Sequence, residues 1–179
     1  LSWKIAAVVA GWADESLLDT YEAERQPVAE LTVQASLGAA RPPASTDGLV
    51  LGASYESSAV MPDGSQRPAA LNPLGDYLPT GRPGHRAPHL WLDDDRVVST
   101  LDLFGAGFVL LTTPAGTAWH NVVQRESHIP IQIHVINHPE WPDLYGIGPL
   151  GAVLVRPDGY VAFRAQGKPT CPSELGDAL

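Results

Sequence analysis

Cysteine is almost absent from this sequence, because Cys171 is the one cysteine among 179 residues. A single cysteine excludes an intramolecular disulfide, a CxxC redox pair and a thiolate zinc cluster, and it fits a reducing, cytoplasmic setting. The sequence also lacks the ~20 consecutive apolar residues that a membrane-spanning helix needs, and its start lacks the residue order of a secretion signal. Because the chain begins with Leu1 and not Met, we expect a processed or engineered chain, or one whose earlier residues are not present.

Positive charge is scarce as well. The 11 Lys and Arg residues stand against 20 Asp and Glu residues, which gives a formal net charge of -9. Such a surface repels phosphate backbones and anionic lipids, so we expect neither nucleic acid nor a membrane as a partner. Hydrophobic residues make up 44% of the chain and charged residues 17%, which predicts a packed soluble fold of one domain or one domain with an appendage.

The first segment, residues 2–10, reads SWKIAAVVA and is apolar on nearly every side except at Lys4. The pattern predicts a helix that Gly11 ends. A helix that is hydrophobic all round belongs inside a larger body, so we expect that part of its cover lies outside this chain.

Two further helices are predicted after it. Asp14 is suited to be the N-cap of a helix over Glu15–Arg25, whose apolar residues fall at helical spacing. Gln26 precedes a proline and is pushed out of the helical region, whereas Pro27 suits the first turn of a new helix that runs to about Gly38. The pattern therefore predicts a kinked helical pair.

Residues 39–89 hold eight of the 17 prolines of the chain and many of its glycines. This composition is typical of an extended connector that wraps around a neighbouring domain. Two stretches within it, Leu49–Tyr55 and Ala59–Met61, are strand-like and flank polar turns suited to capping the edge of a sheet.

A regular pattern returns from Trp91 onward. The predicted strands are Val97–Phe104, Phe108–Thr113, Ile131–Ile136, and the hairpin of Gly151–Arg156 with Tyr160–Arg164 around Pro157-Asp158-Gly159; the predicted helices are Thr117–Ser127 and Cys171–Leu179. This order, β-β-α-β-β-β-α, has one crossover helix and a terminal hairpin followed by a helix. It fits the thioredoxin-like plan, and the expected fold class is α/β.

Three stretches of the chain resemble one protein family. They read LSWKIAAVVAGWADESLLDTYEAERQPVAE near the start, HRAPHLWLDDDRVVSTLDLFGAGFVLLT in the middle and GAVLVRPDGYVAFR near the end. Together and in this order they are similar to the C-terminal portion of the group A flavoprotein monooxygenases, in particular the phenol and chlorophenol hydroxylases and the related polyketide hydroxylases. The resemblance implies helices from a flavin domain over residues 1–38, a Pro/Gly-rich connector over residues 39–90, and a redox-inactive thioredoxin-like domain over residues 91–179.

The resemblance also implies that FAD and NAD(P)H serve the parent protein, in which reduced flavin reacts with dioxygen and one oxygen atom passes to an electron-rich ring. The family's flavin domain and substrate-binding sheet would lie upstream of Leu1. Its GxGxxG fingerprint is absent here, since Gly105-Ala106-Gly107 and Gly146-Ile147-Gly148 lack the third glycine, and Gly75-Asp76 lacks the following Ala and His and is interpreted as a turn.

These absences predict a chain that binds no cofactor by itself and has no turnover alone. Its expected partner is the missing flavin and substrate portion, on the same or on a separate chain, and a homodimer is left open.

Redox and hydrolytic chemistry have little support in the sequence. After the strand ending at Thr113 the chain reads TPAGTAW from that residue, where a redox thioredoxin needs a cysteine of low pKa. Cys171 lies beside Pro172 and is interpreted as an inert residue. Ser, His and Asp are all present, but no GxSxG elbow supports a hydrolase triad.

The histidines and acidic residues are given structural interpretations. His85 and His89 lie four residues apart, as do His134 and His138, but a proline breaks the first pair and the second leaves a strand, so neither pair predicts a metal site. The three carboxylates of Asp93-Asp94-Asp95 predict a solvated turn.

Glu22, Glu24 and Arg25 form the polar cluster that is most similar to the family. Arg25, beside the expected helix break, is suited to clamp a neighbouring backbone by charge-assisted hydrogen bonds, and we interpret the cluster as structural. No catalytic, cofactor-binding or metal-binding residue is assigned on this chain.

Two hypotheses on function follow. The first is the C-terminal fragment of an FAD-dependent aromatic hydroxylase, in which this piece is structural and its thioredoxin-like domain buttresses the flavin domain or supports dimer contacts. The second is a free-standing, redox-silent thioredoxin-like module whose helical arm docks on a partner. A split enzyme, with the flavin part on a second polypeptide, would share features of both.

Overall fold

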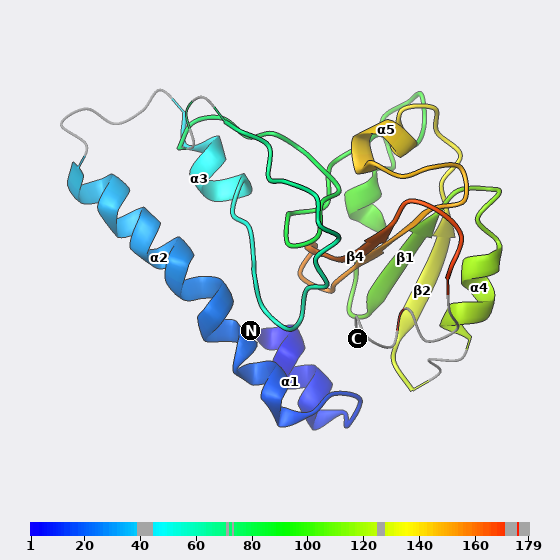
Figure 1. The fold of residues 1–179 in the computed structure, drawn as a ribbon, viewed down its shortest axis with the longest axis horizontal. Coiled ribbons are helices and arrows are strands. Elements are labelled where there is room, and N and C mark those ends of the chain that lie inside the picture. Colours follow the sequence, from blue (N-terminus) through cyan, green and yellow to red (C-terminus); the bar gives the residue numbers. More distant parts are fainter. Residues whose placement is uncertain (39–44, 71, 73, 125–127, 171–174, 176–179) are drawn as a thin grey trace.

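Four strands form a mixed sheet in the C-terminal half of the chain (Figure 1). They are β1 (Phe108–Thr112), β2 (Ile131–Val135), β3 (Ala152–Val155) and β4 (Val161–Ala165), in the spatial order β2-β1-β3-β4. β2 pairs parallel with β1, whereas β3 pairs antiparallel with both β1 and β4. This is the strand arrangement of the thioredoxin-like plan, and the α/β fold class predicted from the sequence is confirmed.

The computed structural model describes residues 1–38, 45–70, 72, 74–124, 128–170 and 175. Its helices are α1 (Ser2–Val9), the 3-10 helix η1 (Glu15–Leu18), α2 (Thr20–Gly38), α3 (Asp47–Leu51), the 3-10 helix η2 (Thr100–Leu103), α4 (Ala118–Val123) and α5 (Trp141–Tyr145). Within these residues no helix is both long enough and apolar enough to cross a membrane. Cys171 and the rest of the predicted helix Cys171–Leu179 apart from Leu175, and the end of the predicted helix Thr117–Ser127, lie outside the described residues.

The sheet is buried on both faces, which explains why its central strands are apolar at consecutive positions. Leu110 and Leu154 pack with Trp119 of α4 in one cluster. The alternate residues of the same strands pack in a second cluster with Trp141 of α5. Every residue of β1 and β3 is buried. The helix α5 was not predicted, because five residues are too few to show a helical period.

The terminal hairpin has the turn that the sequence predicts. β3 and β4 pair antiparallel, and Gly159 takes a positive φ of 79° that a glycine adopts without strain. The turn is closed by the Gly159 amide, which donates to the Arg156 carbonyl at 2.9 Å. This geometry folds Asp158 back toward Arg156, whose side chain it contacts.

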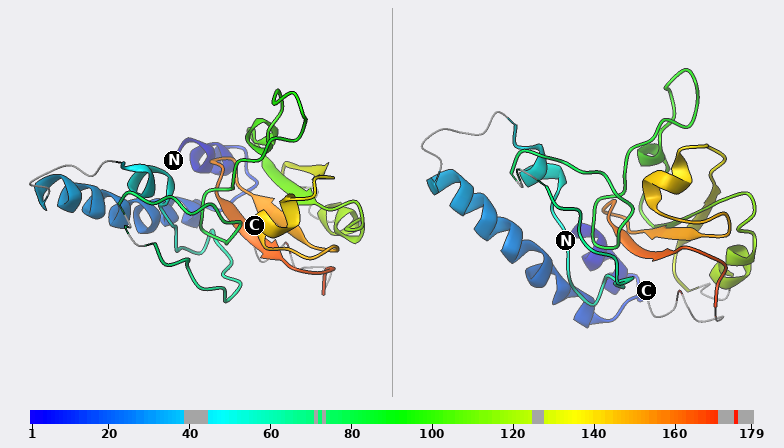
Figure 2. Two further views of the ribbon diagram at one scale, coloured as in Figure 1. Left: turned by 90° about the horizontal axis from the view of Figure 1, so that it is seen from above. Right: turned by 45° about the horizontal axis from the view of Figure 1, so that its top comes forward.

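The N-terminal helices form an arm beside the sheet domain (Figure 2). α1 ends close to the predicted position, and Asp14 caps the next helix by accepting from the Ser16 amide, as predicted. The predicted break at Pro27 is wrong, because α2 runs unbroken through this proline. A proline inside a helix loses one hydrogen bond to the preceding turn, and here that turn is held by the side-chain contacts of Glu24 and Arg25.

Three strand predictions are also wrong. Leu49–Tyr55 contains the helix α3 and not a strand. Val97–Phe104 contains η2, where Ser99 and Asp102 form a capping box that favours a helical turn over an extended chain. Ala59–Met61 is not a strand, yet the Met61 amide donates to the Ala162 carbonyl at 2.8 Å, so this segment does cap the edge of β4.

Candidate functional site

A buried ionic cluster joins the helical arm to the terminal hairpin. Lys4 of α1 and Arg156 at the end of β3 both bind Glu24 of α2, with N–O distances of 2.8 and 2.6 Å. Arg156 also binds Asp158 at 2.6 Å. Lys4, Glu24 and Arg156 are each at most 3% exposed, so these charges have no access to bulk water. Two cations and two anions compensate one another.

The geometry of the cluster fixes the Glu24 carboxylate on all sides. Arg156 donates to both of its oxygens, at 2.6 and 3.0 Å, in the forked arrangement that strengthens an arginine–carboxylate pair. Ser57 of the connector donates to it at 2.7 Å. Lys4 also donates to the Thr20 hydroxyl. Segments 1–38, 45–70 and 128–170 therefore meet at one side chain.

Aromatic rings enclose the Arg156 guanidinium. It lies 5.1 Å from the ring centre of Trp3 and 5.6 Å from that of Tyr55, distances that allow cation–π attraction. Tyr55 stacks on Tyr160 with ring centres 4.0 Å apart. The Trp3 indole N–H donates to Asp158 at 2.9 Å, so α1 touches the hairpin turn directly.

Burial and pairing oppose each other in setting the protonation of the cluster. Burial lowers the pKa of Lys4, and the neighbouring Glu24 carboxylate offsets part of this effect. Burial alone would raise the pKa of Glu24, but the hydrogen bonds and charge of Arg156, with those of Lys4 and Ser57, hold it below its usual value. The carboxylate stays ionised because its cations stay beside it.

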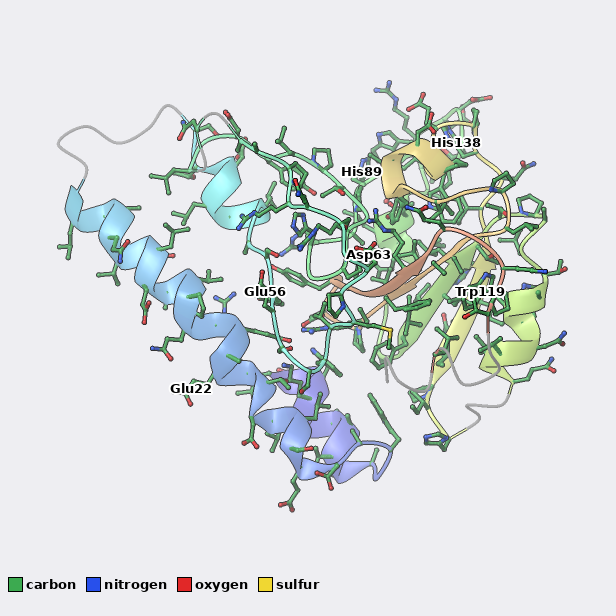
Figure 3. The ribbon with its side chains drawn as sticks, in the orientation of Figure 1. Glu22, Glu56, Asp63, His89, Trp119 and His138 are labelled. Carbon is green, nitrogen blue, oxygen red and sulfur yellow. The ribbon has the colours of Figure 1, made fainter. Side chains whose placement is uncertain are left out.

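The sequence pattern found one member of this cluster and missed the others. The sequence indicates a structural role for Glu24, whereas it shows Lys4 only as the polar exception of an apolar helix, and Arg156 and Asp158 only as parts of a hairpin. Arg25 donates to the Tyr55 hydroxyl at 3.0 Å and not to a backbone group, so the expected backbone clamp is wrong. Glu22 lies on the outer side of α2, exposed to solvent (Figure 3).

The sequence-predicted histidine pairs are dispersed. His85 is buried, whereas His89 is exposed and packs edge-on against Trp91. His134 lies in β2, and His138 beyond it accepts from the Glu140 amide at 3.2 Å (Figure 3). Among the described residues, no group of three or more His, Cys, Asp or Glu side chains is placed to hold a metal ion.

The acidic run and the glycine pairs lie in turns. The Asp93 carboxylate accepts from the amides of Val97 and Val98, each at 2.8 Å, and so closes its own loop. Gly75-Asp76 lies in a turn, as the sequence predicts, with the Asp76 carboxylate accepting from the Asn72 amide. Gly146 ends α5 in the left-handed conformation.

The segment TPAGTAW, residues 113–119, leads from β1 into the first residues of α4, where a redox thioredoxin has its thiol. Thr113 donates to the Pro149 carbonyl, and Thr112 donates to the Gly151 carbonyl at 3.0 Å. The Trp119 indole N–H donates to the Leu150 carbonyl at 2.9 Å. These side chains bind the loop before β3, so the position serves packing within the domain.

Two family models match the chain, one at each end. Residues 80–179 match the model described as "Aromatic-ring hydroxylase, C-terminal", and residues 1–36 match the model of an FAD binding domain. The ionic cluster spans the two matches, because Lys4 and Glu24 lie in the second and Arg156 and Asp158 in the first.

Relatives and solved structures agree with these matches. The tetracenomycin B2 monooxygenase-dioxygenase of Streptomyces olivaceus is 38% identical over 202 residues, covering 100% of this chain and 36% of its own length. The 4-methyl-5-nitrocatechol 5-monooxygenase of a Burkholderia species is 36% identical, covering 100% and 38%. The flavin-dependent monooxygenase PieE, solved with FAD and substrate, superposes with a TM-score of 0.87 at 28% identity, covering 98% and 41%. The chain spans little more than a third of the length of the curated relatives it matches.

Proposed function

The chain belongs to the aromatic-ring hydroxylase family, and from this premise we propose that it is the C-terminal piece of an FAD- and NAD(P)H-dependent monooxygenase that hydroxylates a phenolic or polycyclic aromatic substrate. Its own role is structural. Residues 1–38 belong to the flavin domain, residues 39–90 connect, and residues 91–179 form the thioredoxin-like domain.

The buried cluster around Glu24 is the observation that carries this proposal. It ties helices that match an FAD binding domain to a hairpin that matches the hydroxylase C-terminal domain. Separating the partners of a buried ion pair leaves each charge uncompensated. The ion pairs therefore hold the helices and the hairpin in one relative position. A device of this kind supports a flavin domain without taking part in its chemistry.

The residues of the cluster are unsuited to catalysis. Each of the four charged groups is paired with another member, and three of them are buried from solvent, so none is free to meet a substrate or to exchange a proton with it. Catalysis by a general acid or base needs a group within hydrogen-bond reach of the reacting proton. We assign flavin binding and ring hydroxylation to protein outside this chain.

The exposed apolar face of α1 is evidence that a further part of the protein packs against this helix. Leu1, Ile5 and Val9 are 51, 45 and 82% exposed, and they lie on the side of α1 that faces away from the buried Lys4 and Ala7. Clustered apolar side chains mark surfaces that another body covers. We assign the upstream part of the flavin domain to this face, on the same or a separate chain.

The free-standing binding module is the second candidate function. The match of residues 1–36 to an FAD binding domain favours the hydroxylase fragment over this module. A module of independent use would not require helices of flavin-domain type bound by a buried cluster to its hairpin.

An oxygen-uptake assay tests the proposal. The purified chain is supplied with FAD, a phenol, and NADPH or NADH, beside a full-length relative such as the 4-methyl-5-nitrocatechol 5-monooxygenase with its own substrate. We expect uptake by the relative and none by the chain. Uptake by the chain above the level of free FAD with reduced nicotinamide would show that the chemistry resides here, and the proposal would be wrong.

A further inference from the structure

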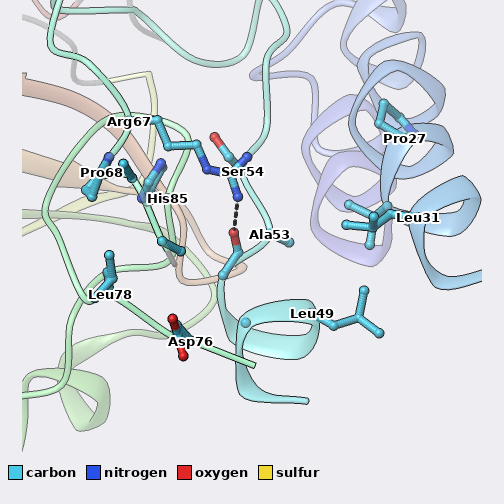
Figure 4. Close-up of a pocket in the computed structure, with 15 residues that line it drawn as sticks. Pro27, Leu31, Leu49, Ala53, Ser54, Arg67, Pro68, Asp76, Leu78 and His85 are labelled. Carbon is cyan, nitrogen blue, oxygen red and sulfur yellow. Dashed lines mark hydrogen bonds between the residues drawn. The ribbon is translucent and has the colours of Figure 1, made fainter. Parts of the chain in front are cut away.

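A cavity of about 440 Å³ lies between α2, α3 and the connector (Figure 4). Its walls are mostly apolar and come from three segments of the chain. They include Pro27, Val28 and Leu31 of α2, Leu49 of α3, and Pro68 and Leu78 of the connector. Leu31 and Leu78 remain 42 and 43% exposed, so the cavity has apolar wall that nothing within the described residues covers. The volume falls within the range of small-molecule sites, roughly 300–1,000 Å³.

Two polar atoms on this wall have no hydrogen-bond partner among the described residues. They are the Ser54 hydroxyl and Nε2 of His85, and both residues line the cavity. Ser54 and His85 pair across an isolated antiparallel bridge, which sets their side chains beside one another. His85 is 8% exposed, so its free nitrogen is buried. A buried polar atom without a partner destabilises the fold, and a ligand atom that bonds to it would remove that cost.

The groups that line the cavity carry no net charge near pH 7. Burial lowers the pKa of His85 to about 4, and the charges of Arg82, Arg67 and Arg164 act in the same direction, so the imidazole is neutral near pH 7. Arg67 and Asp76 both line the cavity and carry opposite charges. The Arg67 side chain is held by the Gly52 carbonyl at 2.8 Å. A neutral imidazole offers one donor and one acceptor.

We propose that this cavity binds an uncharged, largely apolar small molecule that carries one hydroxyl or carbonyl oxygen. The apolar body packs against Leu31, Leu49 and Leu78, and the oxygen forms hydrogen bonds with Ser54 and His85. Arg67 and Asp76 together supply no net counter-charge, so a charged ligand would lose its hydration without compensation and an uncharged one is favoured. The site consists of residues of this chain alone, and the inference goes beyond the proposed function and does not depend on flavin.

Three probes of similar shape separate the contributions that the apolar body, the oxygen and a charge make to binding. The probe 2-naphthol has the apolar body and the hydroxyl, naphthalene lacks the oxygen, and 2-naphthoate carries a negative charge. Equilibrium dialysis against the chain, read by the fluorescence of the probe, gives the three dissociation constants. We expect 2-naphthol to bind roughly 10-fold more tightly than naphthalene, and 2-naphthoate to bind more weakly than 2-naphthol.

Variants assign the affinity to the cavity. Ser54→Ala and His85→Leu should each weaken 2-naphthol roughly 3- to 10-fold while leaving naphthalene within about 2-fold. The matched control His89→Leu, an exposed histidine outside the cavity, should change neither value. Circular dichroism checks that each variant is folded. If His85→Leu does not fold, the test rests on Ser54→Ala alone, because Ser54 is only half-buried.

Two results would overturn the inference. One is equal affinity for 2-naphthol and naphthalene, or no binding of either, because the unpartnered polar atoms would then recognise nothing. The other is tighter binding of 2-naphthoate, which would make Arg67 the centre of an anion site. Neither result bears on oxygen uptake, so failure here is distinguishable from failure of the proposed function.

Discussion

At the scale of single residues, Glu24 carries an unusual share of the contacts, since one carboxylate neutralises Lys4 and Arg156 at once. Glu24→Gln keeps the shape but removes the charge, leaving two buried cations with a single anion between them. We expect the free energy of unfolding to fall by about 3–5 kcal/mol, measured by urea denaturation.

The matched control for this substitution lies two residues earlier on the same helix. Glu22→Gln removes an exposed carboxylate and should change stability by no more than about 0.5 kcal/mol. Similar losses in the two variants would contradict a special role for the cluster.

His85 should make the free energy of unfolding depend on pH, and the direction of its pKa shift sets the sign. Its pKa is about 4 in the folded chain and 6.5 in the unfolded chain, because burial and three arginines disfavour the charged imidazole. Between these values the unfolded state binds the proton and the folded state does not, so stability falls as the pH is lowered from 6.5 toward 4. The loss from this group amounts to about 3 kcal/mol.

Urea denaturation across this pH range, compared with His85→Leu, isolates the effect. The variant should lack this part of the slope, while carboxylates of lowered pKa such as Asp63 act at lower pH in both proteins. Parallel slopes in the two proteins would mean that His85 titrates normally in the fold.

The structural role of Glu24 could be predicted from the sequence, but the contacts of its partners could not. Glu24 was identified because its surroundings resemble a family motif. Lys4 could not be placed, because its neighbours in sequence are apolar and its partner is 20 residues away. Arg156 bonds to Glu24 across 132 residues, and no periodicity reports a contact at that distance. The apolar pattern of residues 2–10 marked a buried helix, but the side turned inward is the one with the lysine.

At the scale of elements, prediction succeeded where the local pattern was unambiguous. β1, β2 and the terminal hairpin are runs of branched or aromatic residues between turn signals, and all were found. Val97–Phe104 also begins with β-branched residues, but the Ser99–Asp102 capping box decided its structure. The helix α2 passes Pro27 because contacts with distant segments outweigh one missing hydrogen bond.

The hairpin turn allows a test of backbone conformation alone. Gly159 has a φ of 79°, and an added Cβ would meet its first neighbour only at 3.9 Å, so space is not limiting. Gly159→Ala should therefore cost about 1 kcal/mol through the left-handed backbone. Gly105→Ala, in open space without a positive φ, should cost less than about 0.5 kcal/mol. Equal thermal stability of the two variants would contradict this assignment of the turn.

At the scale of the whole molecule, three segments far apart in the sequence converge on the cluster. The helical arm, the connector and the hairpin each contribute a side chain to Glu24. The order of the elements predicted the thioredoxin-like plan, but the docking of the arm on the hairpin depends on burial and charge pairing that sequence patterns do not report. The domain boundaries at residues 38 and 90 stay predictions.

The central claim is that this chain supports a flavin enzyme while the flavin itself is held elsewhere. The most direct measurement is the absorbance spectrum of the purified chain after incubation with excess FAD and gel filtration, with a full-length relative treated in the same way. We expect flavin absorbance in the protein peak of the relative and none in that of the chain. Flavin that elutes with the chain in equimolar amount would contradict the account.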